Sequence, residues 1–179
     1  MKNKNSKIFS LTEIAICTSL LCISAYLIIP LPVVPITLQF FTIVLIALLL
    51  KPTQTLTCVG LYIILGIVGL PVFSGGRSGF GALLSPTGGF IIGFLISAYL
   101  ISLLKGKSVP RNIIVSVIFG IIPTYVCGLG FFMIFTNSDL LNAVTSVGAV
   151  FIIIDIAKCI FAPILADIIG NALAKSKSI

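Results

Sequence analysis

The chain of 179 residues contains no histidine and no tryptophan, and charged residues make up only 8% of it. The absence of histidine excludes imidazole bases, histidine proton relays and histidine–metal sites. About a quarter of the residues of a soluble domain are charged, so this chain has too few to cover a water-exposed surface. With 59% apolar residues and a mean hydropathy of +1.29, the composition excludes a soluble globular protein, a disordered chain and a nucleic-acid-binding module. It predicts an integral membrane protein in a lipid bilayer.

The sequence also lacks the side-chain sets that catalysis needs. The five cysteines lie in apolar runs without C-x-x-C spacing, a pattern typical of thiols that fill space. There are no paired carboxylates, no nucleophile with its base and no cluster of metal ligands. The stretch Gly106-Lys107-Ser108 resembles the end of a P-loop, but Ile101 stands where the motif needs glycine. We therefore expect no enzyme, no ATP site, no metal and no cofactor.

The charged residues divide the chain into apolar segments that are long enough to cross a bilayer. Residues 14–50, 52–76, 78–104 and 112–138 carry no charge. The first segment is too long for one span of about 20 residues, and three prolines interrupt it. The sequence predicts a single all-α membrane domain over residues 1–179. Its six transmembrane helices are expected at about residues 10–29, 38–50, 54–70, 87–104, 112–135 and 144–174.

The positions of the cations predict the orientation. An even number of spans places both termini on one side, and lysine and arginine concentrate on the cytoplasmic side. We therefore expect both termini to be cytoplasmic, in a bacterial plasma membrane, and the cations Arg77 and Lys158 do not fit the charge pattern. Nine of the eleven cations fall on the predicted cytoplasmic side: Lys2, Lys4, Lys7, Lys51, Lys105, Lys107, Arg111, Lys175 and Lys177.

Small residues recur every four positions on several predicted helices. Such rows let helices approach closely in lipid, so we expect seams within the bundle, or a docking surface for another membrane subunit. The rows are Gly89, Gly93 and Ser97 on the fourth helix, Gly120, Thr124 and Gly128 on the fifth, and Ala15 with Ser19 on the first.

Two opposite charges interrupt the last apolar run. Asp155 and Lys158 are three residues apart, so they share one face of a helix. A charge within a span costs about 2.5–3.5 kcal/mol on insertion scales, so the pair must face the bundle interior. Counted back from Lys175, it lies in the outer half of the membrane. The pair is either a self-satisfied ion pair or a polar ligand site, with a carboxylate for N–H groups and an ammonium for an oxygen.

The segment between the predicted third and fourth helices, residues 69–89, is rich in glycine and yet apolar. Irregular backbone at membrane depth is tolerated only against protein or a cavity, so we expect this outer loop to pack over the bundle. It carries Arg77 on the outer side. We expect Arg77, Gly75 and Gly76 to contribute to a substrate site, although a solvated Arg77 would also fit the sequence.

Polar residues that follow the first outer loop are expected at about the same membrane depth as Asp155. Prolines make residues 30–35 a stiff link, and Thr37 and Gln39 follow it into the second helix. Gln39 either lines a site or only caps this helix. Because these residues should lie at about the depth of Asp155, the sequence predicts one ligand site in the outer half of the bundle.

Three of these segments resemble the BioY family, the biotin-specific substrate-binding (S) components of energy-coupling factor (ECF) transporters. They are Val34-Pro35-Ile36-Thr37-Leu38-Gln39, the stretch from Gly69 to Phe90, and Asp155-x-x-Lys158. The resemblance covers nearly the whole chain. It implies a subunit that captures biotin from outside with high affinity and works with a transmembrane T component and two cytosolic ATPases.

The resemblance also suggests roles for individual residues. Ala15 and Ser19 match the small-residue motif through which family members contact the T component. Asp155 would accept a ureido N–H of biotin, with Gln39 or Lys158 donating to the ureido oxygen, and Arg77 would pair with the carboxylate. Two alternatives stay open. One is an S component for another vitamin, which the scarcity of stacking aromatics disfavours, and the other is a self-contained facilitator for a small solute.

Overall fold

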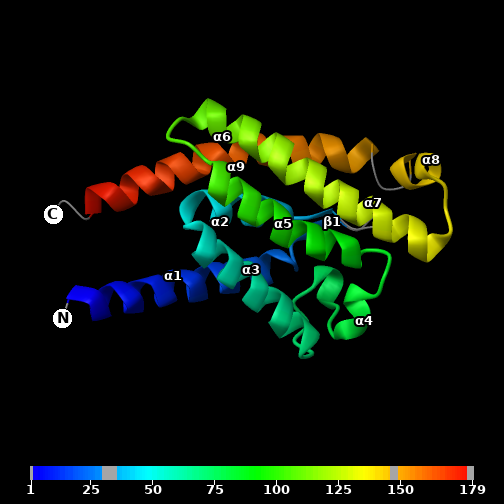
Figure 1. The fold of residues 1–179 in the computed structure, drawn as a ribbon, viewed down its shortest axis with the longest axis horizontal. Helices are drawn as coiled ribbons and strands as arrows, with labels where there is room; N and C mark the ends of the chain where they lie inside the picture. Colours follow the sequence, from blue (N-terminus) through cyan, green and yellow to red (C-terminus); the bar gives the residue numbers. More distant parts are fainter. Residues whose placement is uncertain (1, 30–35, 146–148, 177–179) are drawn as a thin grey trace.

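The computed structural model describes residues 2–29, 36–145 and 149–176. Long helices lie side by side in it, and both termini lie at the same end (Figure 1). The helices are α1 (Lys2–Ser24), α2 (Gln39–Leu49), α3 (Pro52–Ile67), α4 (Phe80–Leu83), α5 (Gly88–Leu104), α6 (Val109–Ser116), α7 (Ile122–Thr136), α8 (Leu140–Ala143) and α9 (Ala149–Ser176). The π-helical turn η2 (Val117–Ile121) joins α6 to α7, the 3-10 turn η1 (Ser74–Gly76) precedes α4, and the strands β1 (Ile28–Ile29) and β2 (Ile36–Thr37) pair antiparallel.

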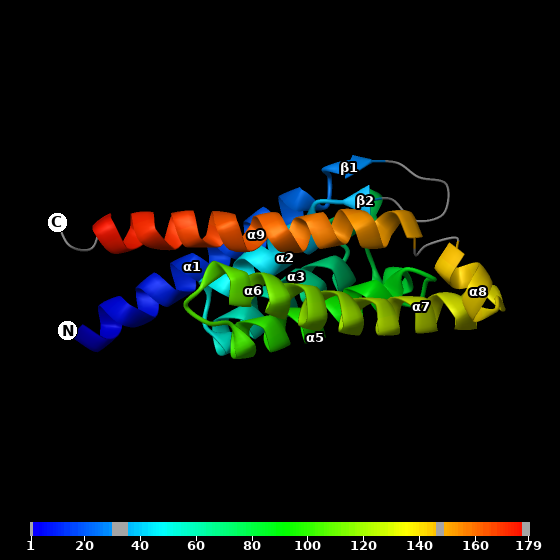
Figure 2. The ribbon, with the colours of Figure 1, turned by 90° about the horizontal axis from the view of Figure 1, so that it is seen from above.

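Helix α2 forms the core of the bundle. It packs against α1, α3, α5 and α9, and Figure 2 shows it between α9 and the layer of α5 and α7. A helix that is apolar all round suits a fully buried position. Accordingly, most residues of α2 are buried, among them Phe40, Ile43 and Ile46.

The outer helices expose apolar side chains. Ile16, Val126 and Phe161 are each more than 60% exposed, at 62%, 67% and 63%, and such faces suit lipid rather than water. In the described part of the chain, two segments are long and apolar enough to span a bilayer, and three further helices are apolar but shorter. The former are Lys7–Ser24 and Val109–Thr136, and the latter are Gln39–Leu49, Pro52–Ile67 and Gly88–Leu104.

Several helix boundaries differ from the sequence prediction, and α1 begins at Lys2, well before the expected start at about residue 10. The first helix was expected to reach about residue 29, but α1 ends at Ser24, whose hydroxyl donates to the Leu21 carbonyl (2.7 Å). The chain then enters β1. Its last residue, Ile29, precedes a proline in the sequence, and a residue in that position avoids the helical region. Helix α3 ends before residue 70 because Gly69 adopts φ 112°, a value that a helix cannot contain.

The last predicted helix, at about residues 144–174, corresponds to α9 over its described part. Helix α8 ends at Ala143, and α9 begins at Ala149 and reaches Ser176. Residues 146–148 of the prediction, like the three prolines at positions 30, 32 and 35, lie outside the described residues.

The rows of small residues predicted on the fourth and fifth helices form a seam within the bundle, between α5 and α7. A Cβ atom on Gly93 would lie 2.7 Å from Thr124 Cα, so a larger residue would push the helices apart. The Ser97 hydroxyl contacts the Thr124 hydroxyl (2.7 Å) and donates to the Gly120 carbonyl in η2 (2.9 Å). This bond satisfies a carbonyl at the π-helical turn, where the regular helical pattern is interrupted.

Lys105 ties α5 to α2 at the end of the bundle that holds both termini. Its ammonium donates to the carbonyls of Ala47 (3.0 Å) and Leu48 (2.8 Å) and contacts that of Leu50. The last carbonyls of a helix lack partners within the helix, and a cation near them is favourable. One of the predicted cytoplasmic cations therefore also caps the core helix.

The glycine-rich segment is anchored to α3 by Phe73. The Phe73 ring is buried, packs edge-on against Tyr62 (centroids 5.6 Å apart, 82° between planes) and covers Gly66 so closely that a Cβ atom there would overlap it. The Gly79 N–H also donates to the Gly66 carbonyl (2.7 Å). Gly66 therefore fixes where the segment lies on the bundle.

We predict that Gly66→Ala lowers the melting temperature of the protein in detergent. The added methyl group must displace the Phe73 ring, and overpacking of this kind costs about 1–3 kcal/mol. Gly60→Ala on the same helix is the matched control, because nothing lies within 4 Å of its Cβ position. Gly60→Ala should leave the melting temperature unchanged or raise it, and an equal response of both variants would contradict this packing.

Candidate ligand-binding site

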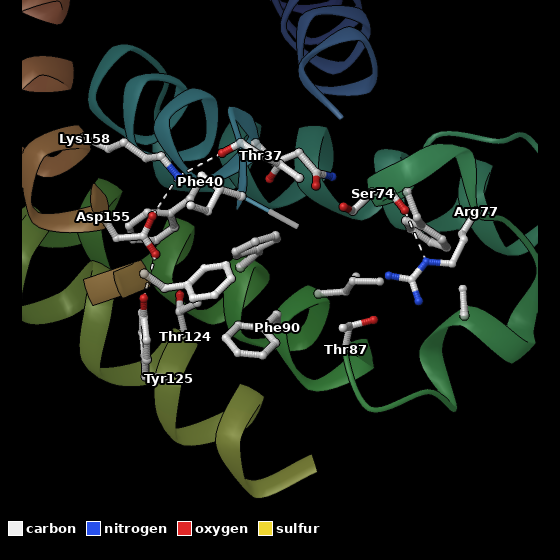
Figure 3. A pocket seen from close by; sticks show the side chains of 17 residues that line it. Thr37, Phe40, Ser74, Arg77, Thr87, Phe90, Thr124, Tyr125, Asp155 and Lys158 are labelled. Atoms are coloured by element: carbon white, nitrogen blue, oxygen red, sulfur yellow. Dashed lines mark hydrogen bonds and ion pairs between the residues drawn. The ribbon is translucent and has the colours of Figure 1, made fainter. Parts of the chain in front are cut away.

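A cavity lies between the core helix α2, the glycine-rich segment and the helices α5, α7 and α9 (Figure 3). Its volume is about 70 Å³, whereas roughly 10–15 Å³ suffices for a single water. It therefore has room for more than a single water molecule. Its wall consists of Ile36, Thr37, Gln39, Phe40, Phe73, Ser74, Arg77, Ala82, Thr87, Phe90, Ile91, Phe94, Thr124, Tyr125, Phe151, Asp155 and Lys158.

One end of the cavity holds a buried ion pair. The Lys158 ammonium lies 2.7 Å from Asp155 Oδ1 and also donates to the Thr37 carbonyl in β2 (2.8 Å). The Tyr125 hydroxyl donates to the other oxygen, Oδ2 of Asp155 (2.9 Å). Asp155 is only 8% exposed. Lys158 from the same helix and Tyr125 from α7 thus each hold one oxygen of the carboxylate, and Thr37 in β2 holds the ammonium, so the pair is oriented before any ligand arrives.

This arrangement leaves hydrogen-bonding capacity unused. A carboxylate offers about four acceptor positions and an ammonium three donors. Within the described residues, Asp155 accepts one bond on each oxygen, and Lys158 donates two. Acceptor positions on Asp155 and one donor of Lys158 are therefore left for a ligand that carries both N–H and C=O groups.

Gln39 also lines the cavity and is 2% exposed. Its amide nitrogen hydrogen-bonds the hydroxyl of Tyr62, and Tyr62 in turn supports the Phe73 ring. This contact orients the Gln39 amide. It also links the polar end of the cavity to the anchor of the glycine-rich segment.

Aromatic rings form the middle of the cavity. Phe40 and Phe94 stack with centroids 6.1 Å apart, and Phe90 meets Tyr125 edge-on at 6.0 Å. Phe151 completes this part of the wall. Such a lining suits an apolar ring or chain.

Arg77 marks the opposite end of the cavity. Figure 3 shows its guanidinium on the far side of the aromatic rings from Asp155 and Lys158. Its Nε donates to the Ser74 carbonyl (3.2 Å), which leaves the terminal nitrogens of the fork for other acceptors. The side chain is exposed, so this end is nearer to the mouth of the cavity than the buried pair.

Five of the residues singled out from the sequence meet in this cavity: Thr37, Gln39, Arg77, Asp155 and Lys158. Their contact with a ligand stays a prediction.

The other predicted residues lie elsewhere. Gly75 and Gly76 do not line the cavity, but both adopt φ 73°, which lets the backbone turn tightly between Ser74 and Arg77. Ala15 and Ser19 are exposed on α1, and the Ser19 hydroxyl donates to the Ala15 carbonyl (2.9 Å).

Sequence reasoning missed Tyr125 and Ser74. Tyr125 stands in an apolar run and carries no charge, so nothing in the sequence distinguishes it from an ordinary core aromatic residue. A tyrosine that is buried nearly always needs a partner for its hydroxyl. Because Asp155 is the acidic residue of the same predicted bundle interior, this need for a partner is the signal that could have connected Tyr125 to Asp155.

A highly apolar helical bundle that encloses such a cavity is a ligand-binding membrane protein. In the described part of the chain, no three metal-binding side chains gather at one place.

The comparisons with known proteins give the family. The model of the BioY family matches residues 1–175, and the chain belongs to this family. "Biotin transporter BioY2" of Lactococcus lactis subsp. cremoris is 37% identical, with 98% of this chain and 95% of that protein covered. "Biotin transporter BioY" of Thermotoga maritima is 35% identical, with 87% and 92% covered.

A solved structure of similar fold supports the family assignment. The crystal structure of the S-component for biotin from an ECF-type ABC transporter superposes with a TM-score of 0.86 at 29% identity, covering 93% of each chain. The helical fold predicted from the sequence is therefore that of a known S-component.

Proposed function

We propose that this chain is the biotin-capture subunit of an ATP-driven ECF uptake transporter. The family and the solved S-component support the class of protein. The observation that carries the choice of ligand is the cavity itself, in which a fixed carboxylate–ammonium pair lies at one end and a guanidinium at the other. Biotin has matching ends, because its ureido group offers N–H and C=O and its tail ends in a carboxylate.

The ureido ring would lie at the buried end. Asp155 would accept a ureido N–H on a free lone pair, and Lys158 or Gln39 would donate to the ureido oxygen. The apolar ring and tail of biotin would lie between Phe40, Phe90 and the other rings. The tail carboxylate would then reach the Arg77 fork, since arginine matches carboxylate geometry with two donors.

The proposed topology has six membrane crossings. They are α1, α2, α3, α5, the unit from α6 to α7, and α9, with both termini cytoplasmic and the glycine-rich segment on the outer side. Lys51 and Lys105 lie next to the ends of α2, α3 and α5 at the end of the bundle where both termini lie (Figure 1), which supports this orientation under the positive-inside rule. The cavity would then open outward.

We predict that the purified protein binds biotin in a calorimetric titration and that Asp155→Asn and Lys158→Ala each weaken binding at least tenfold. Each change leaves its partner's buried charge unpaired, and hydrogen bonds to charged groups contribute about 1.5–3 kcal/mol. Thr57→Ala on the exposed face of α3 is the control and should bind as the original chain does. Unchanged affinity in both site variants would contradict the assignment of the buried end.

We predict that Arg77→Ala weakens binding of biotin by about tenfold or more but changes binding of biotin methyl ester much less. The ester lacks the negative charge that the guanidinium would meet. The measurement is a titration of both proteins with both ligands. An equal loss for the acid and the ester would show that Arg77 does not meet the carboxylate.

A transmembrane T component and two cytosolic ATPases would complete the transporter. Ala15 and Ser19, exposed on α1, would form the contact with the T component, since small residues let helices approach closely in lipid. The chain itself would then capture biotin, and the ATPases would supply the energy for release inside.

We predict that Ala15→Leu combined with Ser19→Leu abolishes ATP-dependent biotin uptake in vesicles with the complete transporter but leaves biotin affinity unchanged. The larger side chains would keep the T component at a distance. Thr57→Leu, an exposed change on α3, is the matched control. Full uptake by the double variant, or uptake in vesicles without the ATPases, would contradict this division of labour.

A further inference from the structure

The Ser74 hydroxyl is buried without a hydrogen-bond partner. In the described part of the chain, two buried side-chain oxygens share this property, those of Ser74 and Ser116. Most buried polar atoms are hydrogen-bonded, so each exception calls for an explanation. Ser116 lies on α6 and does not line the cavity, whereas Ser74 does. An unused donor on the wall of a ligand cavity points to a ligand atom as its partner.

The local backbone holds Ser74 beside Arg77. The Phe73 N–H donates to the Arg77 carbonyl (3.0 Å), the Gly76 N–H donates to the Phe73 carbonyl (3.0 Å), and Arg77 Nε donates to the Ser74 carbonyl (3.2 Å). These bonds close residues 73–77 into a tight loop on the anchor provided by Phe73. Both side chains therefore lie at the same end of the cavity, away from Asp155 (Figure 3).

The Thr87 hydroxyl also lies at this end, but its proton is already used in a hydrogen bond to Ser85. The Ser85 hydroxyl donates its single proton to the Ala82 carbonyl (2.7 Å). The contact between Ser85 and Thr87 (3.1 Å) must therefore be donated by Thr87, since a hydroxyl has one proton. Thr87 has no proton left for a ligand, and Ser74 is the free hydroxyl donor next to the Arg77 fork.

We propose that Ser74 donates a hydrogen bond to the carboxylate of the ligand and, together with Arg77, selects ligands with a free acid tail. This inference rests on the proposed function and adds a specificity-determining residue to it. A carboxylate has acceptor positions for both the guanidinium fork and a hydroxyl. A neutral tail would leave the Ser74 proton without a charged acceptor, so the hydroxyl favours the acid over its ester or amide.

The test is a titration of Ser74→Ala with biotin and with biotin methyl ester. We expect the affinity for biotin to fall about tenfold or more, because a hydrogen bond to a charged group is lost, and the affinity for the ester to change less than threefold. Thermal unfolding without ligand should be no easier than for the original chain, because the hydroxyl has no protein partner to lose.

Ser116→Ala is the matched control, because it removes the other unpaired buried hydroxyl without touching the cavity. It should bind both ligands as the original chain does. If the original chain binds biotin and Ser74→Ala binds it equally well, or loses acid and ester alike, the role of Ser74 is overturned while the proposed function stands. If the original chain does not bind biotin, the proposed function itself fails.

Discussion

The structure depends on one side chain, that of Asp155, which is buried in an apolar bundle and paired with Lys158. A lone ion there would be strongly unfavourable, and a network of three hydrogen bonds offsets that cost. Lys158 neutralises it from the same helix, Tyr125 donates from α7, and the Thr37 carbonyl holds the ammonium from β2. These contacts connect three distant parts of the chain. They also orient the carboxylate, so a ligand would find its partner already in place and would not need to order it.

The second end of the cavity is built by packing instead of charge. Phe73 fits over Gly66 and against Tyr62, and this contact sets the position of the segment that carries Ser74 and Arg77. Because Tyr62 also bonds Gln39, the two ends are joined through one buried tyrosine. The distance between the buried ion pair at one end of the cavity and Arg77 at the other is therefore set by these contacts. That distance is what would distinguish an elongated acid such as biotin from a compact solute.

The sequence predicted those site residues whose charge is unusual for their position in the chain. Asp155 and Lys158 are conspicuous as charges in an apolar run, and Arg77 as a cation on the wrong side. The seam of Gly93 and Ser97 was predictable because small residues repeat at helical spacing. Tyr125 and Ser74 were not, because their roles arise from partners that only the tertiary structure brings near or withholds. The end of α1 at Ser24 was missed for a similar reason, since the apolar run continues past the helix into β1, which pairs with β2.

The most direct test of this account is a crystal structure of the protein with bound biotin. The account predicts that the ureido ring lies within hydrogen-bond distance of the Asp155 carboxylate, that the rings of the middle section enclose the apolar part, and that the tail carboxylate meets Arg77. A reversed ligand, with its carboxylate at the buried ion pair, would contradict it. So would biotin bound outside this cavity.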